Sequence, residues 1–77
     1  MSKFSKAYEA FFRKFLTEVE KYYFKMSPER REALHATLEA LDDYALQHEW
    51  SEELEQYMVK RLRNILEWVR FEDAEAI

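Results

Sequence analysis

Large apolar residues recur along the first third of the chain at steps of three and four. The main line is Phe4, Tyr8, Phe11, Phe15, Val19, Tyr22 and Met26, with Phe12, Leu16 and Tyr23 beside it. A spacing near 3.67 residues per turn places such residues on one face of an α-helix. We therefore predict a helix over residues 4–25 that carries eight of the 13 aromatic side chains.

Two serines divide the rest of the chain into further helical segments. Ser27 precedes Pro28, which suits the first turn of a helix, and Ser51 can cap a helix in the same way. We predict helices over residues 28–48 and 51–71. Their inward-facing residues are Leu34, Leu38, Leu41 and Ala45 in one, and Leu54, Met58, Leu62, Ile65 and Val69 in the other.

Breaks of two or three residues separate the predicted helices, so consecutive helices should run antiparallel. We predict an all-α, up-down-up bundle of three helices that forms a single domain over residues 1–77. The apolar pattern ends at Phe71, and residues 72–77 are expected to form a frayed acidic tail. A chain this short buries only about 60% of its unfolded surface, so homodimerisation or helix swapping could complete the bundle.

The chain has 77 residues and contains neither glycine nor cysteine. Walker loops and dinucleotide-binding folds need glycine and are excluded, and β-hairpins with primed turns are disfavoured. Disulfides and thiolate metal sites are excluded because there is no cysteine. No apolar run approaches the roughly 18 residues of a membrane span, and the first residues lack the apolar core of a signal peptide. We expect a soluble, cytoplasmic protein that does not enter membranes.

The predicted third helix carries a second stripe beside its inner line: Tyr57, Arg61, Asn64, Trp68 and Phe71. Its apolar positions cover roughly 220° of the helix circumference. The apolar stripe of a surface helix is usually about 100° wide or somewhat wider. Phe24 likewise falls opposite the main stripe of its own helix. In one interpretation Tyr57 and Trp68 line the edge of the core. In the other, the stripe and Phe24 form a protein-binding face, because Trp, Tyr and Arg dominate interface hot spots.

Seven acidic side chains gather around the predicted turn between the second and third helices. They are Glu39, Asp42, Asp43, Glu49, Glu52, Glu53 and Glu55. Glu52 and Glu53 suit the positive end of a helix dipole, and the others can form an ordinary solvated surface. Alternatively, the patch mimics nucleic acid and blocks the groove of a DNA- or RNA-binding protein. Such binding would weaken strongly with added salt.

Charge is unevenly distributed along the chain. Residues 1–26 carry six basic and three acidic side chains, net +3, whereas residues 27–49 carry two and six, net −4. The whole chain has a formal net charge of −4, while nucleic-acid-binding modules are usually strongly basic. Helices of about 20 residues also fit poorly with a helix-turn-helix module. We therefore do not expect direct binding to DNA or RNA.

Glu32 and His35 have the Glu-x-x-His spacing that carboxylate-bridged diiron bundles use. With Leu34 facing inward, however, Glu32 projects about 160° away and His35 about 100° away. This divergence predicts a solvated glutamate and a boundary histidine. A metal-binding helical dimer is kept only as a remote alternative.

Catalysis is not expected either. His48 is predicted on the inner side near the end of its helix, but the nearest hydroxyl, that of Ser51, is explained as a cap. We predict a non-catalytic protein–protein interaction module without metal or cofactor. It would be a small regulatory or inhibitory protein of bacterial or phage type that docks on a larger protein or on a second copy. The acidic nucleic-acid mimic is the alternative.

Overall fold

The computed structural model describes the backbone of residues 4–75 and the side chains of residues 4–71. This part of the chain is all-helical, as predicted, and consists of three α-helices. They are α1 (Lys6–Tyr23), α2 (Pro28–Leu46) and α3 (Glu52–Glu75). No strand occurs among residues 4–75.

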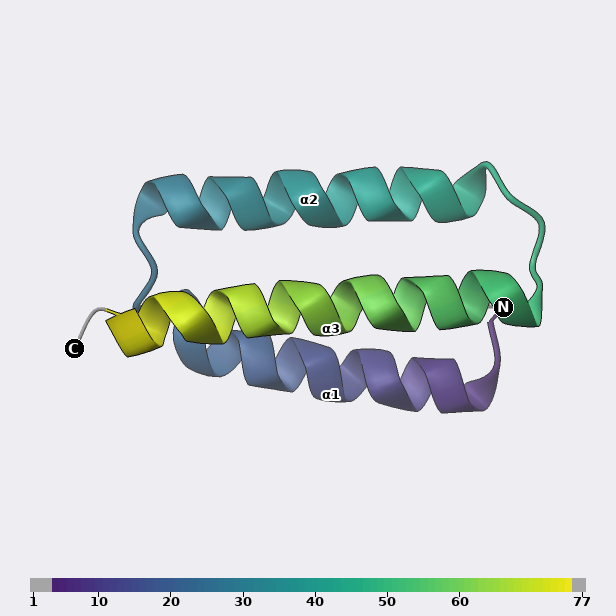
Figure 1. Cartoon of the computed structure of the whole chain (residues 1–77), viewed down its shortest axis with the longest axis horizontal. Helices are drawn as coiled ribbons and strands as arrows, with labels where there is room; N and C mark the ends of the chain where they lie inside the picture. The colour runs from purple at the N-terminus through teal and green to yellow at the C-terminus, as the bar shows by residue number, and fades with distance from the viewer. Residues whose placement is uncertain (1–3, 76–77) are drawn as a thin grey trace.

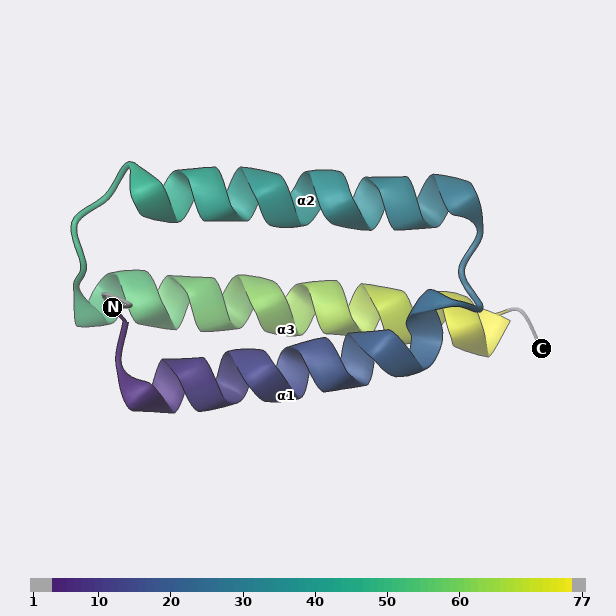
Figure 2. The ribbon, with the colours of Figure 1, turned by 180° about the vertical axis from the view of Figure 1, so that it is seen from behind.

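The three helices lie along one long axis, and the described part measures 41 × 21 × 20 Å. In Figures 1 and 2, α1 and α3 run in the same direction and α2 runs in the opposite one. The backbones of α1 and α3 make the most extensive contact, α2 makes less with α3, and α1 makes little with α2. The arrangement therefore leaves the α1–α2 side the most open.

Serine side chains cap all three helix starts. The Oγ atoms of Ser27 and Ser51 accept from the backbone N–H three residues further on, at 3.2 and 3.0 Å, and both caps were predicted. The first helix begins later than its expected start at Phe4, because the Oγ of Ser5 accepts from the third N–H beyond it at 3.2 Å. Such caps satisfy donors that a helix start otherwise leaves without a partner.

Helices α1 and α2 end two residues earlier than predicted, at Tyr23 and Leu46. The cap residues Phe24 and Gln47 keep right-handed backbone angles, with φ of −74° and −81°. No residue of the described range has a positive φ. The connections therefore need no left-handed residue, which is how a chain without glycine forms them.

Helix α3 extends beyond its predicted end at Phe71 and continues to Glu75. Residues 72–75 thus do not form the expected frayed tail, and residues 76–77 lie outside the described part. After Phe71 the apolar residues no longer recur with a helical period, so this segment has no apolar face to bury. Glu and Ala nevertheless favour a helical backbone. The end of the apolar pattern is therefore not the end of the helix.

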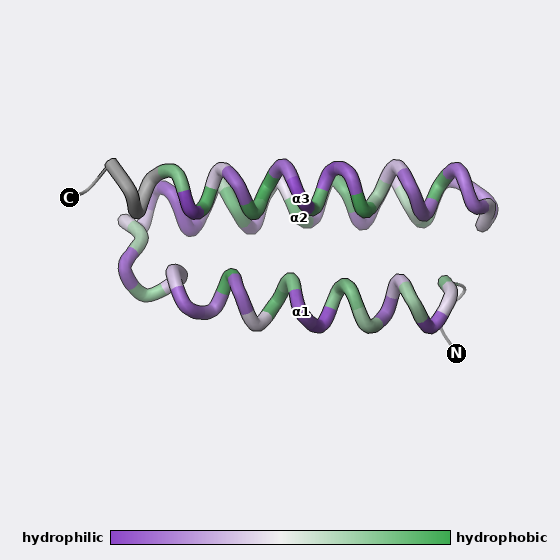
Figure 3. Tube along the Cα trace, turned by 60° about the horizontal axis from the view of Figure 1, so that its bottom comes forward, coloured by the Kyte–Doolittle hydropathy of each residue, from purple (hydrophilic) through white to green (hydrophobic). Residues whose placement is uncertain are grey.

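The core is formed by inward-facing residues of all three helices and by Met26 of the α1–α2 connection. They are Phe15, Val19, Met26, Leu34, Leu41, Ala45, Leu54, Met58, Leu62, Ile65 and Val69. All five predicted inner residues of α3 are among them. Figure 3 shows the matching pattern, in which hydrophobic positions recur along each helix at nearly every turn.

Several residues of the predicted apolar lines remain accessible, and Phe4, Tyr8, Phe11 and Tyr22 of the first main line are only partly buried. Leu16, assigned to the second apolar line of α1, is 46% exposed, and Leu38 on α2 is only partly buried. Because α1 and α2 make little contact, the sides that they turn toward each other are incompletely covered.

Candidate protein-binding site

A groove runs between α2 and α3 on their outer side, and we call it the α2–α3 groove. It consists of two adjoining hollows of about 450 and 210 Å³, which share Thr37, Arg61 and Ile65. The predicted residues Tyr57, Arg61, Asn64 and Trp68 all line it. The other lining residues are Leu34, Ala36, Thr37, Ala40, Leu41, Tyr44 and Ile65. Four of the six residues proposed from the sequence are therefore brought together.

Both ends of the groove are formed by paired side chains. At one end the rings of Tyr44 and Tyr57 lie 4.9 Å apart at 37°. At the other end the Arg30 guanidinium lies 3.8 Å above the Trp68 ring, and its Nη2 donates to the Trp68 carbonyl oxygen at 3.1 Å. Tyr57 and Trp68 remain 39% and 37% exposed. They line the edge of the bundle, and part of the surface of each side chain remains exposed.

The charge of the groove is concentrated in one side chain. Arg61 lines both hollows, and no carboxylate does. Among the described side chains, Arg61 forms no hydrogen bond or ion pair. Facing it, α2 contributes the small residues Ala36 and Ala40, which leave space above their backbone. The middle of the groove is therefore shallow and apolar, and it carries one positive charge, that of Arg61.

The two other predicted binding residues lie outside this groove. Phe71 is 62% exposed and Phe24 is 76% exposed, and neither lines it. Phe71 follows Trp68 by three positions, which carries it about 60° further round the helix and away from α2. Phe24 caps α1, and its ring packs edge-on against Tyr23 at 5.5 Å.

The seven acidic residues around the α2–α3 turn do not share one surface. Glu39 and Asp42 line a cleft between α1 and α2. Glu49 and Glu53 line a separate hollow beside Tyr44. These four residues therefore line two different hollows, because Glu39 and Asp42 lie on α2, whereas Glu49 lies in the α2–α3 turn and Glu53 on α3.

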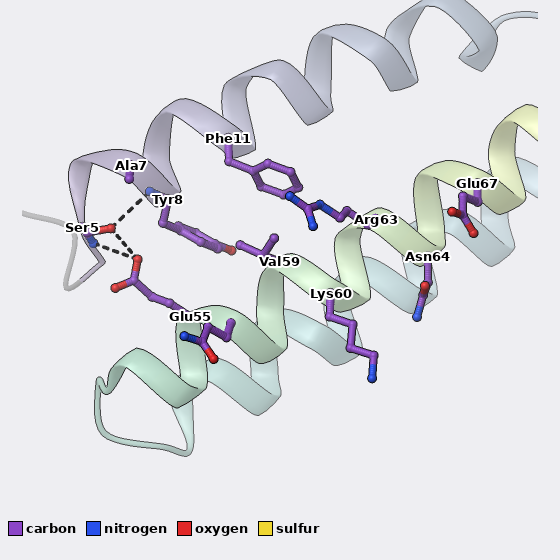
Figure 4. A pocket seen from close by; sticks show the side chains of 11 residues that line it. Ser5, Ala7, Tyr8, Phe11, Glu55, Val59, Lys60, Arg63, Asn64 and Glu67 are labelled. Atoms are coloured by element: carbon purple, nitrogen blue, oxygen red, sulfur yellow. Dashed lines mark hydrogen bonds between the residues drawn. The ribbon is translucent and has the colours of Figure 1, made fainter.

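The remaining acidic residues, Asp43, Glu52 and Glu55, line neither of these two hollows. Asp43 and Glu52 are exposed, and neither lines any of the hollows described here. Glu55, in contrast, reaches α1. Figure 4 shows its carboxylate beside Ser5, whose backbone N–H and hydroxyl both donate to Oε1. The Trp50 Nε1–H donates to Oε2 at 2.7 Å.

The hydrogen bonds to Glu55 affect its titration. The hydroxyl of Ser5 chiefly, and the indole of Trp50 to a smaller extent, hold the pKa of this carboxyl below its usual range, against an opposing effect of burial. The sequence shows that Ser5 can cap a helix and that Glu55 belongs to an acidic first turn. It contains no signal that these two residues, 50 positions apart, form a hydrogen bond.

The hollow between α1 and α3 is bounded by contacts between charged and aromatic groups. Its volume is about 560 Å³, and the Arg63 guanidinium lies 5.7 Å from the centre of the Phe11 ring. In Figure 4, Lys60 and Asn64 point away from α1. At the far end the Arg70 Nη2 donates to the Glu18 carboxylate at 3.1 Å. These contacts join α1 to α3.

The histidines are held by aromatic neighbours. His35 Nε2 lies 2.6 Å from the Tyr23 hydroxyl, in hydrogen-bond contact, while Glu32 is exposed. His48 lies beyond the end of α2 and is exposed, not on the inner side as predicted; its Nδ1 is 2.7 Å from the Tyr44 carbonyl oxygen. No group of three His, Asp or Glu side chains suited to a metal ion occurs in the described range.

The chain matches no protein-family model, no curated protein and no solved structure. None of the helices within residues 4–75 combines the length and apolar character needed to cross a bilayer.

Proposed function

We propose that this protein is a non-catalytic interaction module that binds a larger protein through the α2–α3 groove. The observation that carries the proposal is the gathering of Tyr57, Arg61 and Trp68 along one open groove, with the two aromatic rings more than a third exposed. Trp, Tyr and Arg are the residue types that contribute most to binding energy at protein interfaces. A small regulatory or inhibitory protein would act through such a surface.

The groove is suited to binding because its aromatic residues are already held in place. Tyr44 packs against Tyr57, and Arg30 lies over Trp68. Ordering a mobile side chain on binding costs roughly 0.5 to 1.5 kcal/mol, and side chains that are ordered beforehand avoid much of that cost. The groove would thus act as a preformed slot.

The lining indicates the chemistry of the partner. Ala36 and Ala40 leave room for an apolar side chain, and Arg61 beside them lacks a carboxylate in the described part of the protein. A partner that inserts an apolar side chain next to an Asp or Glu would satisfy both features, because a guanidinium binds carboxylates with paired hydrogen bonds.

The test is affinity capture of partners from cell extract with four immobilised proteins. The wild type is compared with Tyr57→Ala, with Arg61→Ala and with the control Lys60→Ala, which removes a neighbouring charge that does not line the groove. We expect specific partners to be retained by the wild type and by Lys60→Ala and lost from both groove variants. Circular dichroism checks that all four proteins are folded. Partners captured equally by all four would refute the proposal.

A second copy of the chain is the other candidate partner. Large apolar side chains stay exposed on the bundle, among them Phe24 and Phe71. Covering them in a homodimer, or exchanging α1 between two copies, would add the apolar burial that a short chain lacks. Sedimentation velocity at ten to a hundred micromolar tests this proposal. We expect a dimer that Phe71→Ser weakens, and a strict monomer would exclude self-association while leaving the foreign partner open.

A further inference from the structure

A cleft of about 480 Å³ opens between α1 and α2, and we call it the α1–α2 cleft. Its floor is formed by four core residues, Leu41, Ala45, Met58 and Leu62. It therefore reaches from the surface to the centre of the bundle. Small-molecule sites typically have volumes of about 300–1,000 Å³ and a mostly apolar lining.

One wall of the cleft consists of aromatic rings. Phe4, Tyr8 and Phe12 follow each other at every fourth residue along the chain and all line the cleft. The Phe4 and Tyr8 rings are stacked with centroids 4.4 Å apart, and those of Tyr8 and Phe12 are 6.2 Å apart. Aromatic faces carry partial negative charge and attract cations, quaternary ammonium groups in particular.

The opposite wall is formed by α2 and carries the charge. It contributes His35, Leu38, Glu39 and Asp42, while no lysine or arginine lines the cleft. The pKa of the Tyr8 hydroxyl is raised, first by its burial and then by the negative charges of Asp42 and Glu55. The electrostatic influence of Asp42 thus extends across the cleft to the aromatic wall.

The grooves on the two sides of α2 therefore differ in sign. The α2–α3 groove is lined by the cation Arg61 and no carboxylate, whereas the α1–α2 cleft is lined by two carboxylates and no Lys or Arg. One helix thus separates a surface that would accept an anion from one that would accept a cation. The cleft is also independent of the protein-binding role proposed for the groove.

We propose that the α1–α2 cleft is a binding site for a small organic ammonium ion with an apolar body. The apolar part fills the space above Leu41 and Met58, and the cationic head lies between the aromatic wall and the Glu39 and Asp42 carboxylates. Charge complementarity selects the cation, and the limited volume selects a small molecule over a protein helix.

The test uses three ligands whose carbon chains each contain eight carbons, the carboxyl carbon of the acid included, and which differ in the head group. They are octyltrimethylammonium, octanol and octanoate, each titrated into the protein by isothermal calorimetry and by amide chemical-shift mapping. We expect octyltrimethylammonium to bind at least tenfold more tightly than octanoate, with octanol between them. The largest shifts should fall on residues that line the cleft.

Matched variants test whether the cation is recognised by the carboxylates of the cleft or attracted by the negative charge of the protein as a whole. The double variant Glu39→Gln/Asp42→Asn should remove the preference for the cation. The control Asp43→Asn removes the same kind of charge at the next position, which does not line the cleft, and should preserve the preference. A third variant, Leu38→Trp, places a bulky side chain at the wall and should weaken all three ligands.

Three outcomes would overturn the proposal. They are equal affinity for octanoate and octyltrimethylammonium, the same loss of preference in Asp43→Asn as in the double variant, and shifts confined to residues outside the cleft. If none of the ligands binds the folded wild type, the cleft is not a small-molecule site. Circular dichroism confirms that each variant is folded before its binding is compared.

Discussion

The Ser5 hydroxyl donates to the Glu55 carboxylate and joins the start of α1 to the start of α3, across 50 positions of the chain. The same carboxylate accepts from Trp50 in the turn before α3. Glu55 therefore connects three segments: the cap of α1, the α2–α3 turn and the first turn of α3. We call this group of three side chains the Glu55 clamp.

Replacing Glu55 with alanine should destabilise the bundle by about 1 kcal/mol. Hydrogen bonds to charged groups contribute roughly 1.5–3 kcal/mol, and solvent screening reduces this value for a group near the surface. Urea unfolding followed by circular dichroism measures the change. The control is Glu53→Ala, which removes another acidic residue of the first turn of α3 that is exposed. Equal losses from the two variants would show that the helix dipole, and not the clamp, accounts for the effect.

Acid should weaken the fold through the same carboxylate. The pKa of Glu55 is lowered in the folded protein, chiefly by the Ser5 hydroxyl, from an ordinary value of 4.5. A carboxyl group with a depressed folded pKa stabilises the fold above its unfolded pKa, and this contribution is lost as the pH falls through the folded pKa. The free energy of unfolding should thus decrease below about pH 4.5.

Glu55→Gln identifies the source of this acid sensitivity. Glutamine can accept a hydrogen bond but does not titrate, so the variant should show a flatter pH dependence between pH 5 and pH 3. Glu18 contributes in the same direction, because hydrogen bonds from Lys21 and Arg70 lower its pKa as well. Some acid sensitivity should therefore remain in Glu55→Gln. A variant as acid-sensitive as the wild type would exclude Glu55 as the cause.

The apolar period predicted the three helices and most of the core because burial follows the turn of a helix. The five inner residues of α3, from Leu54 to Val69, are all buried. The same reasoning was less accurate for Leu16 and Leu38. Leu38 lines the cleft between α1 and α2. Whether it is covered depends on how far apart these two helices lie, and a pattern within one helix contains no information on that distance.

The candidate site was likewise predicted where it depends on one helix and not where it depends on the packing of two helices. Tyr57, Arg61, Asn64 and Trp68 belong to one stripe of a single helix, so the sequence alone could place them together. Their partners on α2, Arg30 and Tyr44, are contributed by tertiary structure and were not predicted as part of the site. The acidic residues were grouped because they are close in sequence, but they belong to α2, the α2–α3 turn and α3 and line different hollows.

The pair Arg30 and Trp68 should be energetically coupled. The guanidinium lies 3.8 Å from the ring centre and also donates to the Trp68 carbonyl oxygen. Cation–π contacts contribute about 0.5–1 kcal/mol at exposed sites and more where water is excluded. A double-mutant cycle with Arg30→Met and Trp68→Leu should give a coupling energy of about 0.5–1 kcal/mol by urea unfolding. The same cycle with Arg61 in place of Arg30 serves as the control and should give a value near zero.

Alanine substitutions of Leu62 and Leu46 test which of these two leucines belongs to the core. Leu62 is 1% exposed and packs in the middle of α3, whereas Leu46 is 71% exposed at the end of α2. Replacing a buried leucine with alanine removes apolar contacts and leaves a cavity, which typically costs 2–5 kcal/mol. We expect a loss in this range for Leu62→Ala, and a change within about 0.5 kcal/mol for Leu46→Ala, because surface substitutions seldom cost more. Both are measured by chemical denaturation at a concentration at which the wild type shows a single oligomeric state. If Leu46→Ala instead destabilised strongly, and did so more at higher protein concentration, Leu46 would be buried between two copies of the chain.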